Sequence, residues 1–169
     1  MKNSILKFGS YGALLGGSIF VVSHYLFSYI DFDTLEILGY ASIIASLSFI
    51  FFGIKHFRDH QNKGIVSFGK AIVIGLAISA IVGVVIGLLD IIYIVYINPD
   101  FSAEYIQFML DKARETMSLQ EFEAHKTKLI NDMKAFDNPA FSGIFMFAIV
   151  FSFGIIATLI SGIILHRKN

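Results

Sequence analysis

The ionisable side chains inside the long apolar runs of the sequence are the first candidates for chemistry. Asp90 is the only acid that lies far from both ends of such a run, and His24 lies inside another. A charge in the hydrocarbon of a bilayer is costly, so an acid there indicates a polar contact between helices or a functional site. We predict that His24 and Asp90 form an intramembrane polar pair. Two interpretations stay open: a hydrogen bond that fixes helix register, and a site for a proton or an ion.

The second candidate is a pair of histidines, His56 and His60, which lie four residues apart in a charged segment. That spacing could place both imidazoles on one metal ion, but the only neighbouring ligand is Asp59. We expect a turn that faces solvent or lipid headgroups, and no metal site. The sequence has no cysteine, and it has no nucleophile-elbow, phosphate-loop, zinc-protease or dinucleotide motif. We therefore expect no catalytic residues, no cofactor and no enzymatic activity.

The composition places these residues in a membrane. Of the 169 residues, 56% are hydrophobic and 15% are charged, and the mean hydropathy is +0.72. Soluble domains carry about 25% charged residues, so this chain has too few for a surface that faces water. The formal net charge is zero, which gives no indication of a nucleic-acid partner. The composition predicts an integral membrane protein whose main surroundings are the lipid bilayer.

Four apolar runs are long enough to cross a bilayer, which takes roughly 20 helical residues. They cover residues 8–30, 35–54, 71–97 and 141–165. Backbone in lipid must satisfy its own hydrogen bonds, so each run should be a helix. The first run is longer than the apolar part of a signal peptide, and we expect it to be retained. The predicted fold is all-α: a four-helix transmembrane bundle that forms a single membrane domain over residues 1–169.

The Lys and Arg residues near the ends of these runs predict their orientation. Cations cluster near both termini and in the segment between the second and third runs, whereas the segment between the first and second runs has acids only. We expect a multi-pass protein with both termini in the cytoplasm. Residues 98–140 should then be extracytoplasmic.

The segment 98–140 carries two apolar stripes at helical spacing, which predicts an extracytoplasmic helical hairpin between the third and fourth runs. Ser102 is the expected N-cap of its first helix. Ser118 and Glu121 fit a capping box at the start of the second. The hairpin could act as a lid on the bundle or as a docking surface for a membrane or extracytoplasmic protein.

Small residues recur at every fourth position of the third run and predict a close helix contact, because helices in lipid pair most tightly through small side chains. This small-residue series consists of Ala71, Gly75, Ser79, Gly83 and Gly87. Asp90 lies about 20° around the helix from Gly83 and should also point into the bundle. The series fits packing within the chain, and a homo-oligomer is the alternative.

Four short motifs, in order, resemble a known family. They are GIKHFRD at 53–59, GIVSFGKA at 64–71, YINPDF at 96–101 and ILHRK at 164–168. Together they are similar to domain-of-unknown-function family 4199, and the similarity extends over nearly the whole chain. The resemblance implies a small protein of the bacterial inner membrane with no assigned activity, no known cofactor and no defined catalytic residues.

These observations favour a non-enzymatic membrane protein, an accessory or scaffold subunit, as the function. The alternative is a small transporter or channel that uses the polar site at His24 and Asp90.

Overall fold

The computed structural model describes residues 1–25 and 30–167. For His24, it describes the backbone but not the side chain. The described residues fold into helices and contain no strand. The long helices are α1 (Lys2–Tyr25), α2 (Phe32–His56), α3 (Phe68–Ile92) and α6 (Pro139–Leu165). Two shorter helices, α4 (Phe101–Thr116) and α5 (Leu119–Met133), lie between α3 and α6 in the chain. Single helical turns extend three of these helices: η2 (Phe57–Gln61), η3 (Tyr93–Ile97) and η4 (Lys134–Asp137).

The four long helices are long and apolar enough to cross a membrane. Large apolar side chains on their surfaces are exposed, among them Leu14, Ile44, Ile144 and Ile163, each more than 60% exposed. Side chains of this kind on every long helix suit hydrocarbon rather than water, since lipid tails are as apolar as they are. Both the length of the apolar helices and the apolar side chains on their surface therefore indicate a membrane protein.

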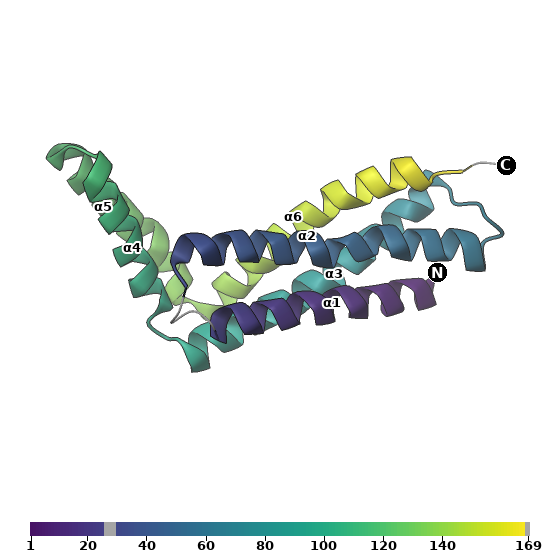
Figure 1. Ribbon diagram of the computed structural model, residues 1–169, viewed down its shortest axis with the longest axis horizontal. Helices are drawn as coiled ribbons and strands as arrows, with labels where there is room; N and C mark the ends of the chain where they lie inside the picture. Colours follow the sequence, from purple (N-terminus) through teal and green to yellow (C-terminus); the bar gives the residue numbers. More distant parts are fainter. Residues whose placement is uncertain (26–29, 168–169) are drawn as a thin grey trace.

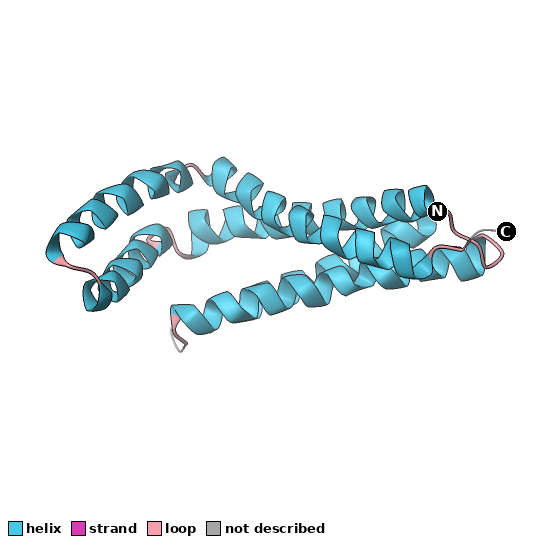
Figure 2. Cartoon of the chain, turned by 90° about the horizontal axis from the view of Figure 1, so that it is seen from above, coloured by secondary structure: helices cyan, strands magenta, loops and turns pink. Residues whose placement is uncertain are grey.

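The long helices lie side by side along the long axis of the molecule (Figure 1). Helices α2 and α3 contact each other, and each also contacts both α1 and α6. Both chain ends lie at one end of the molecule, here called the termini end, together with the connection between α2 and α3 (Figure 1). Helices α4 and α5 lie at the opposite end, here called the α4–α5 end, as Figure 2 also shows.

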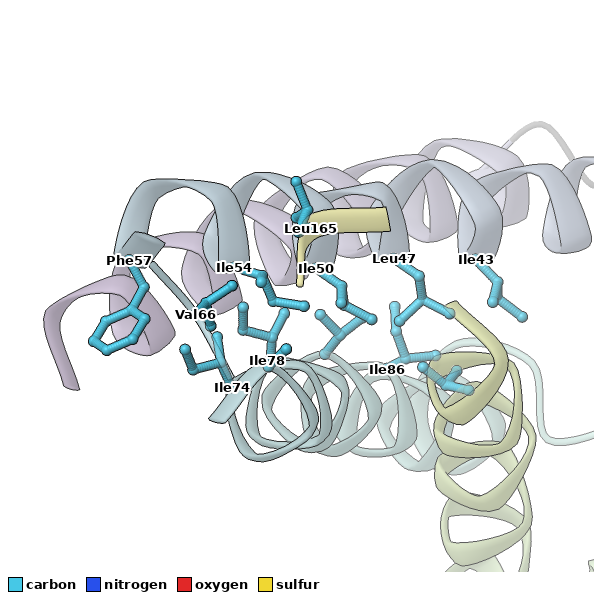
Figure 3. Close-up of a cluster of buried hydrophobic side chains, with 13 residues drawn as sticks. Ile43, Leu47, Ile50, Ile54, Phe57, Val66, Ile74, Ile78, Ile86 and Leu165 are labelled. Atoms are coloured by element: carbon cyan, nitrogen blue, oxygen red, sulfur yellow. The ribbon is translucent and has the colours of Figure 1, made fainter. Parts of the chain in front are cut away.

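The core forms mainly where α2 faces α3. Ile50 and Ile54 of α2 are fully buried, as are Ile74 and Ile78 of α3. Figure 3 shows the side chains of α2 pointing toward those of α3. Between helices that are already in lipid, such packing stabilises through close van der Waals contact rather than through removal from water.

Local sequence signals explain where several helices begin. Asp31 caps α2, because its carboxylate accepts a hydrogen bond from the Thr34 N–H at 2.8 Å. Asn138 caps α6, with Pro139 at the first helical position. Ser118 and Glu121 form the predicted capping box at the start of α5. The turn before α3 contains Gly64 at φ 82°, a left-handed conformation that glycine adopts without strain.

The predicted N-cap of α4 is wrong. Helix α4 begins at Phe101, and Asp100 occupies the cap position without a side-chain hydrogen bond. The amide N–H of Asn98 bonds the Tyr93 carbonyl where the preceding π turn ends, and α4 begins two residues earlier than an N-cap at Ser102 predicts. The first helix also begins earlier than the predicted apolar run, at Lys2.

Candidate functional site

Asp90 lies near the end of α3, and its carboxylate accepts a hydrogen bond from the Ser142 hydroxyl at 2.6 Å. The two residues meet because α3 and α6 approach closely one turn away: a β-carbon added at Gly87 would lie 2.5 Å from the Gly143 carbonyl oxygen. Ser142 is 8% exposed and Asp90 is half-buried. The glycine contact thus positions an acid of one helix against a hydroxyl of another.

A cavity of about 210 Å³ adjoins this contact at the α4–α5 end. Its polar walls come from two carboxylates and two hydroxyls, those of Asp90, Asp137, Ser102 and Ser142. Such oxygen atoms suit a proton or a hard cation. In the part of the chain that the structure describes, no group of three or more His, Cys, Asp or Glu side chains could hold a metal ion. The cavity is therefore a polar recess with two acids.

The predicted partner of Asp90 lies outside the described residues. The backbone of His24 belongs to α1, but its side chain is not described, so the His24–Asp90 pair stays a prediction. Sequence reasoning missed Ser142 and Asp137. The available signal was weak: both lie within five residues of Pro139, where the chain had to enter the fourth apolar run.

The small-residue series of α3 lies against α6. Each member has a neighbour there, in antiparallel order: Ala71 with Gly162, Gly75 with Thr158, Ser79 with Gly154, Gly83 with Phe147, and Gly87 with Gly143. The Thr158 hydroxyl is buried against Gly75 and has no hydrogen-bond partner among the described residues. The series and α6 thus form one continuous close contact, here called the α3–α6 seam.

His56 and His60 lie at the termini end, with their rings stacked at 4.9 Å between centroids. His60 is exposed, whereas His56 is half-buried, with its Nδ1 3.0 Å from the Ser4 hydroxyl. Helix α2 continues here as the π turn η2 rather than ending in an open turn, and His56 packs against Phe8 of α1.

The chain ends are tied to this same region. The N-terminal amine donates a hydrogen bond to the Gln61 side chain at 2.6 Å, and the Arg167 N–H donates one to the Val66 carbonyl at 3.0 Å.

Helix α4 docks on the beginning of α2 through aromatic and charged contacts that the sequence did not predict. The Phe32 ring stacks on Phe108 at 4.9 Å and also contacts Tyr105 and Phe101. The Lys112 ammonium bonds the Asp33 carboxylate at 2.5 Å, which raises the pKa of this lysine. These contacts hold α4 over the end of the long helices.

Four helices apolar enough to span a membrane, with an additional pair of helices between the third and fourth, define an α-helical membrane protein. The family comparison agrees with this class. The model of a family described as "Protein of unknown function (DUF4199)" matches residues 7–167, and the chain belongs to that family. None of the curated proteins and none of the solved structures matches the chain.

Proposed function

We propose that this protein is a non-enzymatic accessory or scaffold subunit of the bacterial inner membrane. The observation that carries the proposal is the position of α5. This helix packs on α4 and continues into η4, and it stands away from the four long helices (Figure 1). Its first residue, Leu119, is 80% exposed, and Ile130 is 38% exposed. A capped, ordered helix with exposed apolar side chains fits a docking surface for another protein.

The proposed orientation places α4 and α5 outside as an extracytoplasmic helical hairpin, with both termini in the cytoplasm. The support is the charge distribution: Lys2, Lys7, Lys55 and Lys63 all belong to segments at the termini end. Cations near the ends of spans favour the cytoplasmic side. The partner would then be a membrane or extracytoplasmic protein, or a second copy of this chain.

Site-specific photocrosslinking in native membranes tests the docking role. A crosslinking residue at position 119 should form a discrete adduct of higher mass. The matched control is position 63, which is also exposed but lies at the termini end, and it should give no such adduct. If the chain is recovered alone from both positions, the accessory role is wrong. An adduct with the mass of a dimer would identify the partner as a second copy.

The alternative function is a small proton or cation transporter or channel. The specific observation in its favour is the polar recess beside Asp90 and Ser142. An intramembrane acid at such a recess could bind and release a proton or an ion. Proteoliposomes of the wild-type chain should then show a flux that Asp90→Asn abolishes and that Val84→Leu, on an exposed face of the same helix, leaves intact. Absence of flux from the wild type would contradict this alternative.

A further inference from the structure

A second cavity, of about 320 Å³, lies beneath α4 at the α4–α5 end. It is bounded by α1, α2, α4 and α6, and we call it the α2–α4 cavity. Most of its wall is apolar, formed chiefly by Phe20, Phe32, Ile43, Phe108, Met146 and Ile149. Protein interiors are packed as densely as organic crystals, so a void of this size at the boundary of four helices has room for a ligand.

One position on α2 leaves this space open. Gly39 lines the cavity, and a β-carbon added there would have no atom within 4 Å. Any larger residue at position 39 would project into free space, so this glycine contributes to the capacity of the cavity.

A second apolar recess lies next to the cavity, on the lipid-facing side of α2 and α6. Tyr40 lines the cavity, and its ring lies 6.1 Å from that of Phe153. Phe153 in turn lines an apolar recess of about 370 Å³ between α2 and α6. Both rings are exposed, Tyr40 at 45% and Phe153 at 36%. The ring pair therefore separates the cavity from a recess on the surface that faces hydrocarbon.

The charges at the polar end of the cavity are mainly acidic. Glu36 lines the cavity, and Asp31 and Asp33 lie about one turn before it. The only cation bonded to these acids in the described chain is Lys112, which pairs with Asp33. The Thr34 backbone N–H lowers the pKa of Asp31, so that carboxylate stays ionised at neutral pH. An anionic group would be repelled here and a cationic group attracted.

Tyr105 supplies a hydroxyl to the same end of the cavity. Burial raises the pKa of this tyrosine, and the nearby charge of Glu36 raises it further. The hydroxyl therefore stays protonated and can donate a hydrogen bond to an ester or phosphate oxygen.

We propose that the α2–α4 cavity binds one acyl chain of a bilayer lipid that carries an ammonium headgroup, with the ammonium against the Glu36 carboxylate. The acyl chain enters from the α2–α6 recess, past Tyr40 and Phe153. This occupant satisfies both halves of the site: hydrocarbon fills the aromatic and aliphatic walls, and a cation meets the acids. The inference does not depend on which side of the membrane the α4–α5 end faces, nor on the proposed accessory role.

Native mass spectrometry of the purified full chain in detergent tests this proposal. The probes are phosphatidylethanolamine and phosphatidylglycerol with identical acyl chains, added in equal amounts. The wild type should retain one ethanolamine lipid per chain in preference to the glycerol lipid by about fivefold, the factor expected for one partly exposed ion pair. Equal retention of the two lipids by the wild type would overturn the headgroup assignment.

Two variants distinguish binding of the acyl chain from binding of the headgroup. Gly39→Leu should fill the cavity and reduce retention of both lipids by about tenfold, because several buried methylene contacts are lost. Glu36→Gln should retain lipid but lose the preference for ethanolamine. The matched control is Gly69→Leu, since position 69 also has open space around it and lies in the first turn of α3 at the termini end.

Folding of the filled variant is checked by thermal unfolding in detergent. Gly39→Leu should unfold at or above the wild-type temperature, because leucine favours helix more than glycine and meets no atom at this position. Retention by Gly39→Leu equal to that of Gly69→Leu would show lipid bound elsewhere on the surface, and the proposal would be wrong. If Gly39→Leu failed to fold, the wild-type preference and its loss in Glu36→Gln would decide the result.

Discussion

At the scale of single residues, the hydrogen bond between Asp90 and Ser142 is a polar contact between α3 and α6. The two residues are 52 positions apart in the chain and come from different helices. Ser142 is buried, so removing its acceptor leaves a hydroxyl without that bond in an apolar setting. Buried polar groups that lose a partner cost free energy, which makes the site sensitive to substitution.

Asp90→Asn and Asp90→Leu should therefore differ in stability. The amide of asparagine keeps an oxygen that can accept the bond from Ser142, whereas leucine keeps none. We expect Asp90→Leu to unfold more easily than Asp90→Asn by about 1 kcal/mol, the size typical of hydrogen bonds between membrane helices. Denaturant unfolding in detergent, followed by circular dichroism, measures the difference. Equal stability of the two variants would mean that Ser142 does not depend on this carboxylate.

Glu121 gives α5 a dependence on pH. Its carboxylate accepts bonds from the Ser118 hydroxyl at 2.6 Å and from the Ser118 N–H at 3.0 Å, and these bonds lower the pKa of Glu121. A carboxyl with a lowered pKa in the folded state stabilises above its usual pKa, and the effect is lost as the pH falls through the folded value.

Acidification from neutral pH should therefore loosen the first turn of α5 in the wild type. Glutamine keeps the capping bonds without an ionisable group, so Glu121→Gln should not show this part of the pH dependence. Hydrogen exchange at residues 119–123, compared between the two proteins from pH 7 to pH 3, measures the effect. Identical pH profiles would contradict the role of the ionised carboxylate.

At the scale of helices, the α3–α6 seam is the most extensive contact between two helices in the described chain. Gly83 illustrates its geometry, because a β-carbon added there would lie 2.9 Å from a ring carbon of Phe147. Val84, the next residue, is 49% exposed. Gly83 thus faces the tight contact with α6, whereas the adjacent Val84 faces the lipid.

Gly83→Leu should consequently destabilise the protein far more than Val84→Leu. We expect a loss of about 1–3 kcal/mol for the first, the usual result of overpacking, and little change for the second. Thermal unfolding of the two variants in the same detergent provides the comparison. Comparable unfolding temperatures would show that α3 and α6 do not pack through Gly83.

The sequence predicted which residues of α3 lie in a close helix contact, but it did not predict which residues of another helix they meet. The four-residue period of Gly75, Gly83 and Gly87 predicted a close contact, and Asp90 was expected on the same side. The partners Thr158 and Ser142 depend on how far α6 is shifted along α3. That shift follows from packing of the whole group of helices, and no local pattern encodes it.

At the scale of the whole molecule, the docking of α4 couples the two shorter helices to the spanning part. The contacts are the aromatic group around Phe32 and the ion pair of Lys112 with Asp33. Composition predicted the number of apolar spans, and the capping box predicted the start of α5. A lid on the spanning helices was one of the two predicted roles of this segment, but the residues that hold α4 in place were not predicted. They lie in separate helices that only the folded chain brings together.

Phe32→Ala should loosen this docking. The stacked pair with Phe108 is worth about 0.5–1.5 kcal/mol beyond the area that it buries. We expect faster hydrogen exchange across α4 in Phe32→Ala than in the wild type. Lys128→Ala, an exposed position on α5, serves as the control and should exchange like the wild type. Unchanged exchange of α4 in Phe32→Ala would mean that other contacts hold it in place.

The proposed topology is a chain that crosses the membrane four times, with the termini end in the cytoplasm and the α4–α5 end outside. Because the sequence has no cysteine, a single introduced cysteine reports its own location. Lys63→Cys and Lys128→Cys place exposed thiols at the two ends. A membrane-impermeant maleimide added to intact spheroplasts should label Lys128→Cys, and should label Lys63→Cys only after the membrane is permeabilised. The reverse pattern, or labelling of both positions in intact cells, would contradict this topology.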